Sequence, residues 1–234
     1  MQPAGHARSV RSYVMRAGRI TEAQQRALST IWPRYGTEFT PGALDLARVF
    51  GRAAACTLEI GFGNGEHLLE RAIAAPERDF LGIEVHRPGI GHLLLAADKA
   101  GIANLRVIAH DAVEVLHWQI APDSIAELQL LFPDPWPKTR HHKRRIVQPD
   151  FADLVASRLI PGGRFHLATD WEPYAQEMLA VLGACEALRN CAGHGFIDRV
   201  MDRAATRFER RGERLGHRVR ELLFERPDRR GRPP

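Results

Sequence analysis

A carboxylate and a flat aromatic side chain stand two residues apart in a proline-rich loop, 131–138 (LFPDPWPK). Three prolines within five residues fix the backbone φ angle and stiffen the loop, so Asp134 and Trp136 are expected to point in fixed directions. An acid beside an aromatic ring suits a purine base, because the ring can stack on the base while the carboxylate accepts hydrogen bonds from its edge. The loop therefore predicts a base-binding site, with a proline-rich turn that only ends a strand as the alternative.

The chemistry that suits this pair is transfer of a methyl group to N7 of guanine. That nitrogen carries a free lone pair, so no proton has to leave before the methyl group is transferred. The protein then has to position the base and to stabilise the positive charge that appears on it. A carboxylate at Asp134 could do both, which makes Asp134 the candidate catalytic residue.

A second segment that could bind a ligand is the glycine-rich string LEIGFGNGE at 58–66. Gly61, Gly63 and Gly65 permit a tight turn between a strand and a helix, and they let a ligand approach the backbone closely. The spacing is G-x-G-x-G rather than the G-x-G-x-x-G of dinucleotide sites, and Glu59 lies two positions before the first glycine. A carboxylate here suits a ligand that has an ammonium group and no phosphate, such as S-adenosylmethionine. A nicotinamide-dependent oxidoreductase and a turn without a ligand are the alternatives.

Two further acids follow the next expected strands. Glu84 ends a strand nineteen residues after Gly65, where a carboxylate can accept both hydroxyls of a ribose. Asp111 follows the strand after that and could bind an adenine amino group, with the backbone N–H of Ala112 as a second contact. Asp111 could instead cap the helix that follows it, and the two roles are compatible. Glu84 indicates a nucleoside without choosing between S-adenosylmethionine and a dinucleotide.

Positive charge concentrates in a basic segment, 138–145 (KTRHHKRR), which holds five Lys or Arg, two His and no acid. Because it starts where the proline-rich loop ends, its charges are expected at the mouth of the pocket, where they would neutralise phosphates and make affinity depend on salt. Such contacts position an RNA without reading its sequence. The alternative is a solvated loop. The candidate RNA contacts are Lys138, Arg140, His141, His142, Lys143, Arg144 and Arg145.

Two other functional classes compete with an RNA methyltransferase. A methyltransferase that acts on small molecules or proteins would share the cofactor site but would not need the basic segment. A non-catalytic RNA-binding module would not need the acids Glu59, Glu84 and Asp111. Together, the acids and the basic segment favour an enzyme that acts on RNA.

Short β-rich runs alternate with helical segments from residue 57 onward. This alternation predicts βαβ units, and hence an α/β fold with a mostly parallel central sheet and helices on both faces. Right-handed crossovers place the carboxyl ends of the strands on one edge, where open α/β sheets bind ligands. The expected strands are 57–61, 80–85, 105–109, 125–132 and 164–169, the expected helices are 21–31, 66–75, 91–100, 113–118, 150–159 and 172–182, and the last strands are expected within 191–225.

The overall composition fits one domain with a polyanionic partner. The 234 residues are 44% hydrophobic and carry a formal net charge of +5, which allows one sizeable core and favours a nucleic acid. No apolar run is long enough to cross a membrane. Three cysteines are too few for a disulfide framework and eleven scattered histidines predict no metal site, so a cytoplasmic location is expected.

Five strings of this chain resemble the bacterial tRNA (guanine-N7-)-methyltransferase family (TrmB type). They are LEIGFGNGEHL, GIEVH, LLFPDPWPKTRHHKRR, ATDWEPYA and TRFERRGERLGH, and the likeness runs from about Arg11 to about Glu225. The third string is very specific, whereas a G-x-G-x-G turn alone is not. The resemblance implies a Rossmann-like class I methyltransferase fold, S-adenosyl-L-methionine as the methyl donor, and guanine at position 46 in the variable loop of tRNA as the acceptor.

The resemblance also implies roles by motif position. Four acids would contact the cofactor, namely Glu59, Glu84, Asp111 and Asp134, and the last would also be catalytic. The segment 206–209 would fold back over the pocket. Asp170, which ends the fifth expected strand, could alternatively cap the next helix. The implied substrate contacts, besides the RNA-contacting loop at 140–145, are Lys138, Asp170, Thr206, Arg207, Phe208 and Glu209.

On this interpretation the chain has three parts. Residues 1–50 form a basic N-terminal extension that is partly helical and in part open to disorder. Residues 51–225 form the methyltransferase domain, and 226–234 form a disordered tail rich in Arg and Pro. The sequence leaves a monomer and a homodimer both open.

Overall fold

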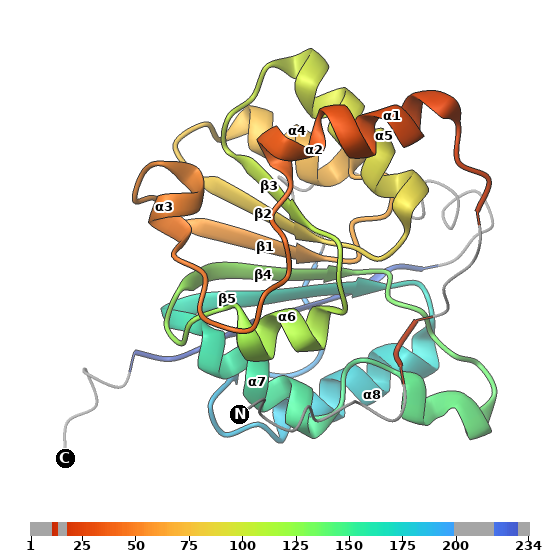
Figure 1. The fold of residues 1–234 in the computed structure, drawn as a ribbon. Helices are drawn as coiled ribbons and strands as arrows, with labels where there is room; N and C mark the ends of the chain where they lie inside the picture. The colour runs from red at the N-terminus through yellow and green to blue at the C-terminus, as the bar shows by residue number, and fades with distance from the viewer. Residues whose placement is uncertain (1–10, 14–17, 199–217, 229–234) are drawn as a thin grey trace, which may run out of the picture.

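The structure, a computed structural model, describes residues 11–13, 18–198 and 218–228. A seven-stranded sheet with the order β3-β2-β1-β4-β5-β7-β6 lies between two layers of helices (Figure 1). Strands β1 to β5 are parallel, whereas β7 runs antiparallel to both β5 and β6. The predicted α/β fold with a mostly parallel sheet and helices on both faces is confirmed. The strands are β1 (Cys56–Ile60), β2 (Asp79–Ile83), β3 (Leu105–Ile108), β4 (Ile125–Leu131), β5 (Leu159–Thr169), β6 (Arg189–Asn190) and β7 (Arg220–Glu225).

The central strands are covered on both faces, which explains their nearly continuous apolar sequences. Every residue of β1 and β2 is buried. The chain runs outward in one direction through β1, β2 and β3, then returns past β1 to form β4 and β5. The order therefore reverses between β1 and β4, and open α/β sheets bind ligands at the carboxyl ends of the strands that flank such a reversal.

Helices α1, α2, α4 and α5 cover one face of the sheet, and α6, α7 and α8 cover the other (Figure 1). Each layer has its own apolar core. Leu68, Ile90 and Leu93 are buried in the first core, and Val115 and Phe151 in the second. The helices are α1 (Glu22–Thr30), α2 (Trp32–Tyr35), α3 (Leu46–Phe50), α4 (Glu66–Ala74), α5 (Arg87–Ala100), α6 (Ala112–Trp118), the 3-10 helix η1 (Thr139–Arg144), α7 (Pro149–Arg158) and α8 (Glu172–Gly183).

The described N-terminal helices belong to the same core as the sheet. Helix α1 begins with a capping box between Thr21 and Gln24, which satisfies amides that the first helical turn leaves free. The ring of Tyr35 is fully buried, and its hydroxyl lies 3.1 Å and 2.9 Å from the carbonyl oxygens of Ala97 and Ile102. Residues 22–35 therefore pack on α5 and are part of the folded domain. The sequence predicted no helix where α2 and α3 occur, because four- and five-residue helices show no periodicity.

Helix α5 begins four residues before the predicted start at Gly91. A proline in the first turn, Pro88, starts this helix, since it lacks an N–H that would be unpaired there in any case. Gly89 is required for a close approach: a Cβ on it would lie 2.0 Å from the carbonyl oxygen of Gly63. The start of α5 is thereby packed against the glycine-rich turn, which fixes one wall of the site described next.

Candidate active site

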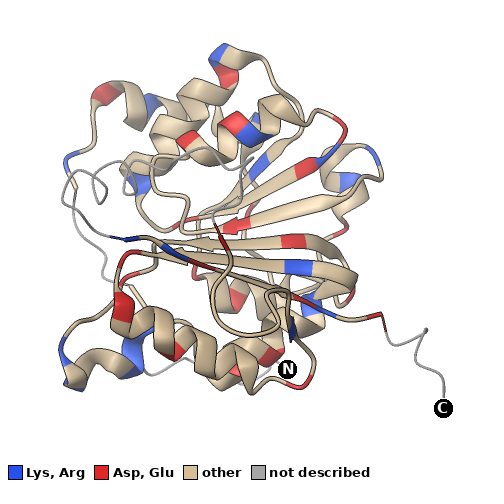
Figure 2. Cartoon of the chain, turned by 180° about the vertical axis from the view of Figure 1, so that it is seen from behind, with Lys and Arg blue, Asp and Glu red and all other residues tan. Residues whose placement is uncertain are grey.

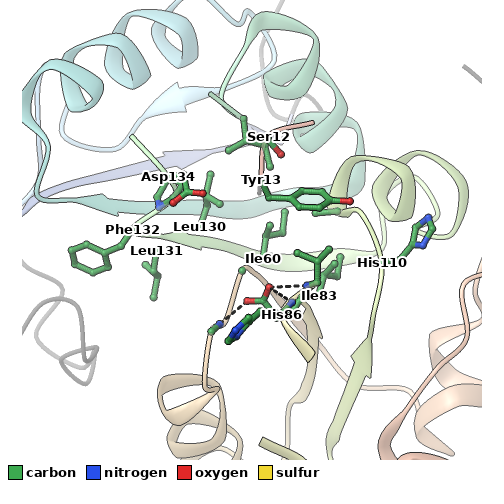
Figure 3. Close-up of a pocket in the computed structure, with 17 residues that line it drawn as sticks. Ser12, Tyr13, Ile60, Ile83, His86, His110, Leu130, Leu131, Phe132 and Asp134 are labelled. Carbon is green, nitrogen blue, oxygen red and sulfur yellow. Dashed lines mark hydrogen bonds between the residues drawn. The ribbon is translucent and has the colours of Figure 1, made fainter. Parts of the chain in front are cut away.

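A cavity of about 330 Å³ opens at the carboxyl ends of β1, β2 and β4, where the strand order reverses (Figure 3). Ligand pockets of this kind enclose roughly 300–1,000 Å³, so a nucleoside-sized molecule fits. Five of the predicted cofactor residues line the cavity, namely Gly61, Gly63, Glu84, Ala112 and Asp134. The structure thus brings together residues that are up to 73 positions apart in the sequence, counted from Gly61 to Asp134.

The glycine-rich turn presents bare backbone to this cavity. Gly61 and Gly63 have φ angles of +72° and +60°, a left-handed conformation that disfavours other residues. A Cβ built on either glycine meets no atom within 4 Å, so the space beside the turn is open to a ligand. Gly65 has another role, because a Cβ there would lie 2.7 Å from the side chain of Leu93 on α5. Gly65 therefore serves helix packing, while the other two glycines face the ligand space.

The carboxylate of Glu84 is fixed by three backbone amides. One oxygen accepts a hydrogen bond from Gly63 N–H at 2.8 Å. The other accepts from Val85 N–H at 2.7 Å and from His86 N–H at 3.0 Å. An ionised carboxylate has about four acceptor positions, so the oxygen bonded to Gly63 keeps one for a ligand hydroxyl. The geometry fits the predicted ribose contact.

Asp111 caps helix α6 instead of lining the cavity. Its Oδ1 accepts hydrogen bonds from Val113 N–H at 2.8 Å and Glu114 N–H at 3.3 Å. Its neighbours on either side, His110 and Ala112, do line the cavity. The capping role that the sequence allowed for Asp111 is confirmed. Of the two residues predicted to contact the adenine, Asp111 and Ala112, only Ala112 lines the cavity.

Glu59 is buried behind the glycine-rich turn and does not line the cavity. His67 Nδ1 on α4 donates a hydrogen bond to its carboxylate at 2.9 Å, and both side chains are about 4% exposed. The other ring nitrogen of His67 is buried without a hydrogen-bond partner. In this structure Glu59 therefore supports the turn from behind, and a direct contact with a cofactor stays a prediction.

Two residues of the proline-rich loop adopt an uncommon backbone conformation. Phe132 and Trp136 have φ angles of +52° and +44°, which few non-glycine residues show and which cluster at functional sites. Phe132 N–H donates to the carbonyl of Ala168 at 2.8 Å, which ties the start of the loop to the end of β5. The indole N–H of Trp136 donates to the backbone carbonyl of Ser12 at 3.1 Å. Between these two anchors Asp134 is exposed at the rim of the cavity.

The structure contradicts the predicted RNA contact of Arg145. Its side chain is only 2% exposed, because it turns inward and holds the proline-rich loop. Its Nε donates to the carbonyl of Pro135 at 2.9 Å, its Nη1 pairs with the carboxylate of Glu177, and its guanidinium lies 4.8 Å from the ring centre of Tyr174. A guanidinium buried in this way cannot reach a phosphate.

The rest of the basic segment is at the surface. Most of it forms the 3-10 helix η1, whose Lys and Arg positions are coloured blue at the lower left of the ribbon in Figure 2. The Arg144 guanidinium lies 4.8 Å from the ring centre of Trp136, and the His141 ring packs edge-on against the same indole at 5.8 Å. Desolvation and repulsion by neighbouring cations, Arg140 and Arg144 foremost, lower the pKa of His141 from its usual 6.5. Trp136 thus links the basic segment to the cavity rim.

The other predicted substrate contacts are placed only in part. Asp170 follows β5 at the same sheet edge, and the N-cap residue of α8 is Trp171. The segment Thr206, Arg207, Phe208 and Glu209 lies outside the described residues.

Ser12, Tyr13 and His110 are among the cavity residues that were not predicted from the sequence. Ser12 and Tyr13 come from the N-terminal segment, and His110 precedes Asp111. His110 stacks face to face on Phe39, with ring centres 3.7 Å apart, and its Nε2 pairs with Glu114. No local pattern identifies Ser12 or Tyr13, because the rest of the cavity comes from segments far away in the chain.

Within the described ranges, no helix combines the length and the apolar character needed to cross a membrane. In the same part of the chain, no three His, Cys, Asp or Glu side chains are grouped so that they could hold a metal ion.

Comparisons with known proteins show the family to which this chain is similar. A family model described as "Putative methyltransferase" matches residues 53–222. The chain is 56% identical over 220 residues to the tRNA (guanine-N(7)-)-methyltransferase of Klebsiella pneumoniae subsp. pneumoniae, covering 94% of this chain and 92% of the relative. It is 53% identical over 224 residues to the protein of the same name from Halorhodospira halophila, covering 94% of this chain and 97% of the relative.

Among solved structures, a mutant of the 16S rRNA (adenine(1408)-N(1))-methyltransferase from Catenulisporales acidiphilia, with cosubstrate SAM, has a TM-score of 0.52. The two chains are 18% identical, and the match covers 80% of this chain and 92% of that chain, which shows a shared fold. The predicted class I methyltransferase fold is therefore confirmed. From its sequence identity to these relatives, the chain belongs to the tRNA (guanine-N(7)-)-methyltransferase family.

Proposed function

We propose that this protein transfers a methyl group from S-adenosyl-L-methionine to N7 of guanine in tRNA, at position 46 of the variable loop, with Asp134 as the catalytic residue. One observation carries the proposal. The rim of the cavity that holds the glycine-rich turn and Glu84 is formed by the proline-rich loop with Asp134, and the basic helix η1 follows that loop directly. The proposed cofactor site, the proposed purine-binding acid and the proposed phosphate-binding surface are thus adjacent.

The cavity residues fit the cofactor by their chemistry. The bare backbone at Gly61 and Gly63 leaves room for its amino-acid end, and Glu84 keeps an acceptor for a ribose hydroxyl. Ile60, Ile83 and Leu130 supply an apolar lining for the adenosyl part. When bound, the cofactor supplies an electrophilic methyl group on a positively charged sulfur, which the N7 lone pair attacks in line as the carbon–sulfur bond breaks.

The residues of the loop would position the base and stabilise charge. Asp134 can accept hydrogen bonds from the N–H groups of the guanine edge, and its negative charge offsets the positive charge that appears on the imidazole ring of the base. No general base is needed, because N7 carries no proton. Since the loop is held by its prolines, by Arg145 and by the two anchors at Phe132 and Trp136, it needs little reorganisation during the reaction.

The exposed cations of helix η1 would hold the tRNA by its phosphates. Phosphate contacts of this kind fix the orientation of the nucleic acid and leave recognition to the shape of the tRNA and to an unstacked guanine. The contacts that the resemblance assigns to Asp170 and to 206–209 are part of this proposal. A cytoplasmic location is also part of it, because the proposed substrate is tRNA.

A methyl-transfer assay tests the proposal, with labelled S-adenosylmethionine, unmodified tRNA and nucleoside analysis of the product. Label in 7-methylguanosine is expected. Asp134→Asn should reduce turnover by at least about a hundredfold, while binding of S-adenosylhomocysteine is retained. The control is Glu77→Gln, an exposed carboxylate just before β2 at the opposite edge of the sheet, which should retain normal turnover. Label at another atom of tRNA, or near-normal turnover by Asp134→Asn, would contradict the assignment.

A further inference from the structure

A short N-terminal segment, 11–13, lies against the cofactor cavity. Ser12 and Tyr13 both line it, although more than 40 residues separate them from β1, the first strand of the sheet. Figure 3 shows Ser12 and Tyr13 on one side of the cavity, and Ile60, Ile83 and His86 on the other. The glycine-rich turn and the strand ends therefore form only part of the cavity wall, and the N-terminal segment supplies the side that faces them.

The Tyr13 side chain extends along the cavity toward His110 (Figure 3). Burial raises the pKa of its phenol, and the nearby negative charges of Asp111 and, to a smaller extent, Glu114 raise it further, while Arg11 opposes this. Asp111 and Glu114 stand at the start of α6, next to His110 and Ala112. The phenol is therefore close to the α6 end of the cavity, where an adenine is expected, and Figure 3 shows it pointing away from Asp134.

The segment is tied to the proline-rich loop. The indole N–H of Trp136 donates to the carbonyl of Ser12, immediately before Tyr13. The acceptor is a backbone atom, so the bond constrains the path of the chain without depending on the Ser12 side chain. The Trp136 ring also contacts the Arg144 guanidinium and the His141 ring, which help to hold it in place.

We infer that Tyr13 is a cofactor-binding residue, whose ring covers the adenosyl part of S-adenosylmethionine and whose position is set by the hydrogen bond between Trp136 and Ser12. An aromatic ring stacks on a purine with offset or edge-to-face geometry and excludes water from one of its sides. Opposite the ring, Ile60 and Ile83 supply an apolar surface, so the adenosyl group is enclosed between them. Tyr13 holds the cofactor and takes no part in the methyl transfer.

The competing explanation predicts the opposite change in cofactor affinity when the Tyr13 ring is removed. If the Tyr13 ring occupied the place of the adenosyl group, it would have to leave before the cofactor binds, and its removal would tighten binding. If it covers the group, its removal weakens binding. The direction of the change in affinity therefore decides between the two.

Calorimetric titration with S-adenosylhomocysteine, without tRNA, makes this measurement. This product keeps the adenosyl group and cannot transfer a methyl group, so a failure here is distinguishable from a failure of the proposed methylation. We expect Tyr13→Ala to raise the Kd about tenfold and Tyr13→Phe, which keeps the ring, to change it by less than about twofold. Thermal unfolding of each variant verifies that it is folded. A Kd that is unchanged or lower in Tyr13→Ala overturns the inference, and so does an equal loss in Tyr13→Phe, since the hydroxyl would then carry the effect.

A double-mutant cycle tests the tether. Trp136→Phe keeps an aromatic ring beside Arg144 and removes the N–H that reaches Ser12. It should raise the Kd for S-adenosylhomocysteine by itself, and it should add nothing to the loss already caused by Tyr13→Ala, because both changes remove the same contact. Fully additive losses in the double variant would show that Trp136 does not act through Tyr13.

Discussion

Replacement of Arg145 separates a structural cation from the neighbouring cations that we propose to bind RNA. Arg145→Met keeps much of the buried aliphatic volume and removes the guanidinium. The change breaks the hydrogen bond to the Pro135 carbonyl, the ion pair with Glu177 and the contact with the Tyr174 ring. The neighbouring Arg144→Ala is the matched comparison, because it removes a cation of the same segment that lies at the surface.

The contacts of Arg145 set the size of the effect. A hydrogen bond to a charged group contributes about 1.5–3 kcal/mol, and a desolvated cation–π contact contributes about 1–2 kcal/mol. Breaking a fully buried ion pair costs about 3–5 kcal/mol, but the Glu177 side chain is 30% exposed and water can solvate it. Arg145 Nη2 is buried without a partner, which lowers the net contribution of the group. We therefore expect a loss of about 3 kcal/mol in the free energy of unfolding, equivalent to a fall of roughly 6–12 °C in Tm.

Two assays on the same pair of variants test this reasoning. Urea unfolding should show the loss in Arg145→Met and a change within about 0.5 kcal/mol in Arg144→Ala. The salt dependence of tRNA binding should show the reverse: Arg144→Ala lowers the slope by about one unit, and Arg145→Met, measured where it is folded, leaves it unchanged. Equal stability of Arg145→Met and the parent protein would refute the structural role. A reduced salt slope for tRNA binding by Arg145→Met would instead indicate that Arg145 contacts a phosphate.

Three further outcomes follow from the site. Because the pKa of His141 is lowered, the ring is neutral at pH 7.5 and gains its proton below pH 6.5. The affinity for tRNA, measured by fluorescence anisotropy, should therefore rise as the pH falls to 6, and His141→Gln should remove that rise. Glu84→Gln places an amide N–H against backbone donors, and calorimetry should show at least tenfold weaker binding of S-adenosylhomocysteine; unchanged affinity would exclude the ribose contact. Gly63→Ala puts a Cβ in the ligand space at a left-handed φ, so it should lower the free energy of unfolding by about 1–2 kcal/mol and weaken the same ligand; unaltered stability would contradict the φ assignment.

The sheet and its order of elements could be predicted because the central strands are apolar on both faces. Strands β1 to β4 begin and end within two residues of the predicted ranges. Strand β5 begins five residues before the predicted start, since Pro161, Gly162 and Gly163 conceal its first half in the sequence. Short helices such as α2 were missed, because their formation depends on burial of Tyr35 against α5 and not on local periodicity.

The site could be predicted where a motif is local, and not where contacts join distant segments. The glycine-rich turn and Glu84 meet in the cavity as expected, because each ends a parallel strand. Arg145 looks like its exposed neighbours in the sequence, but its contacts with Pro135, Tyr174 and Glu177, up to 32 residues away, hold it inward. The contact between Ser12 and Trp136 spans 124 residues, so no pattern in either segment indicates it.

The antiparallel strand β7 has a practical consequence for handling the protein. It starts at Arg220 beside Thr169, at the edge that carries the cavity, and ends at Glu225 beside Arg164. Arg226 then bonds through its backbone to Gly162 and Gly163, at the opposite edge. A purification tag or a surface anchor that follows Asp228 in the chain therefore starts from the side remote from the proposed tRNA-binding surface. One attached before Arg11 starts beside the cofactor, so immobilised binding experiments should use the C-terminal attachment.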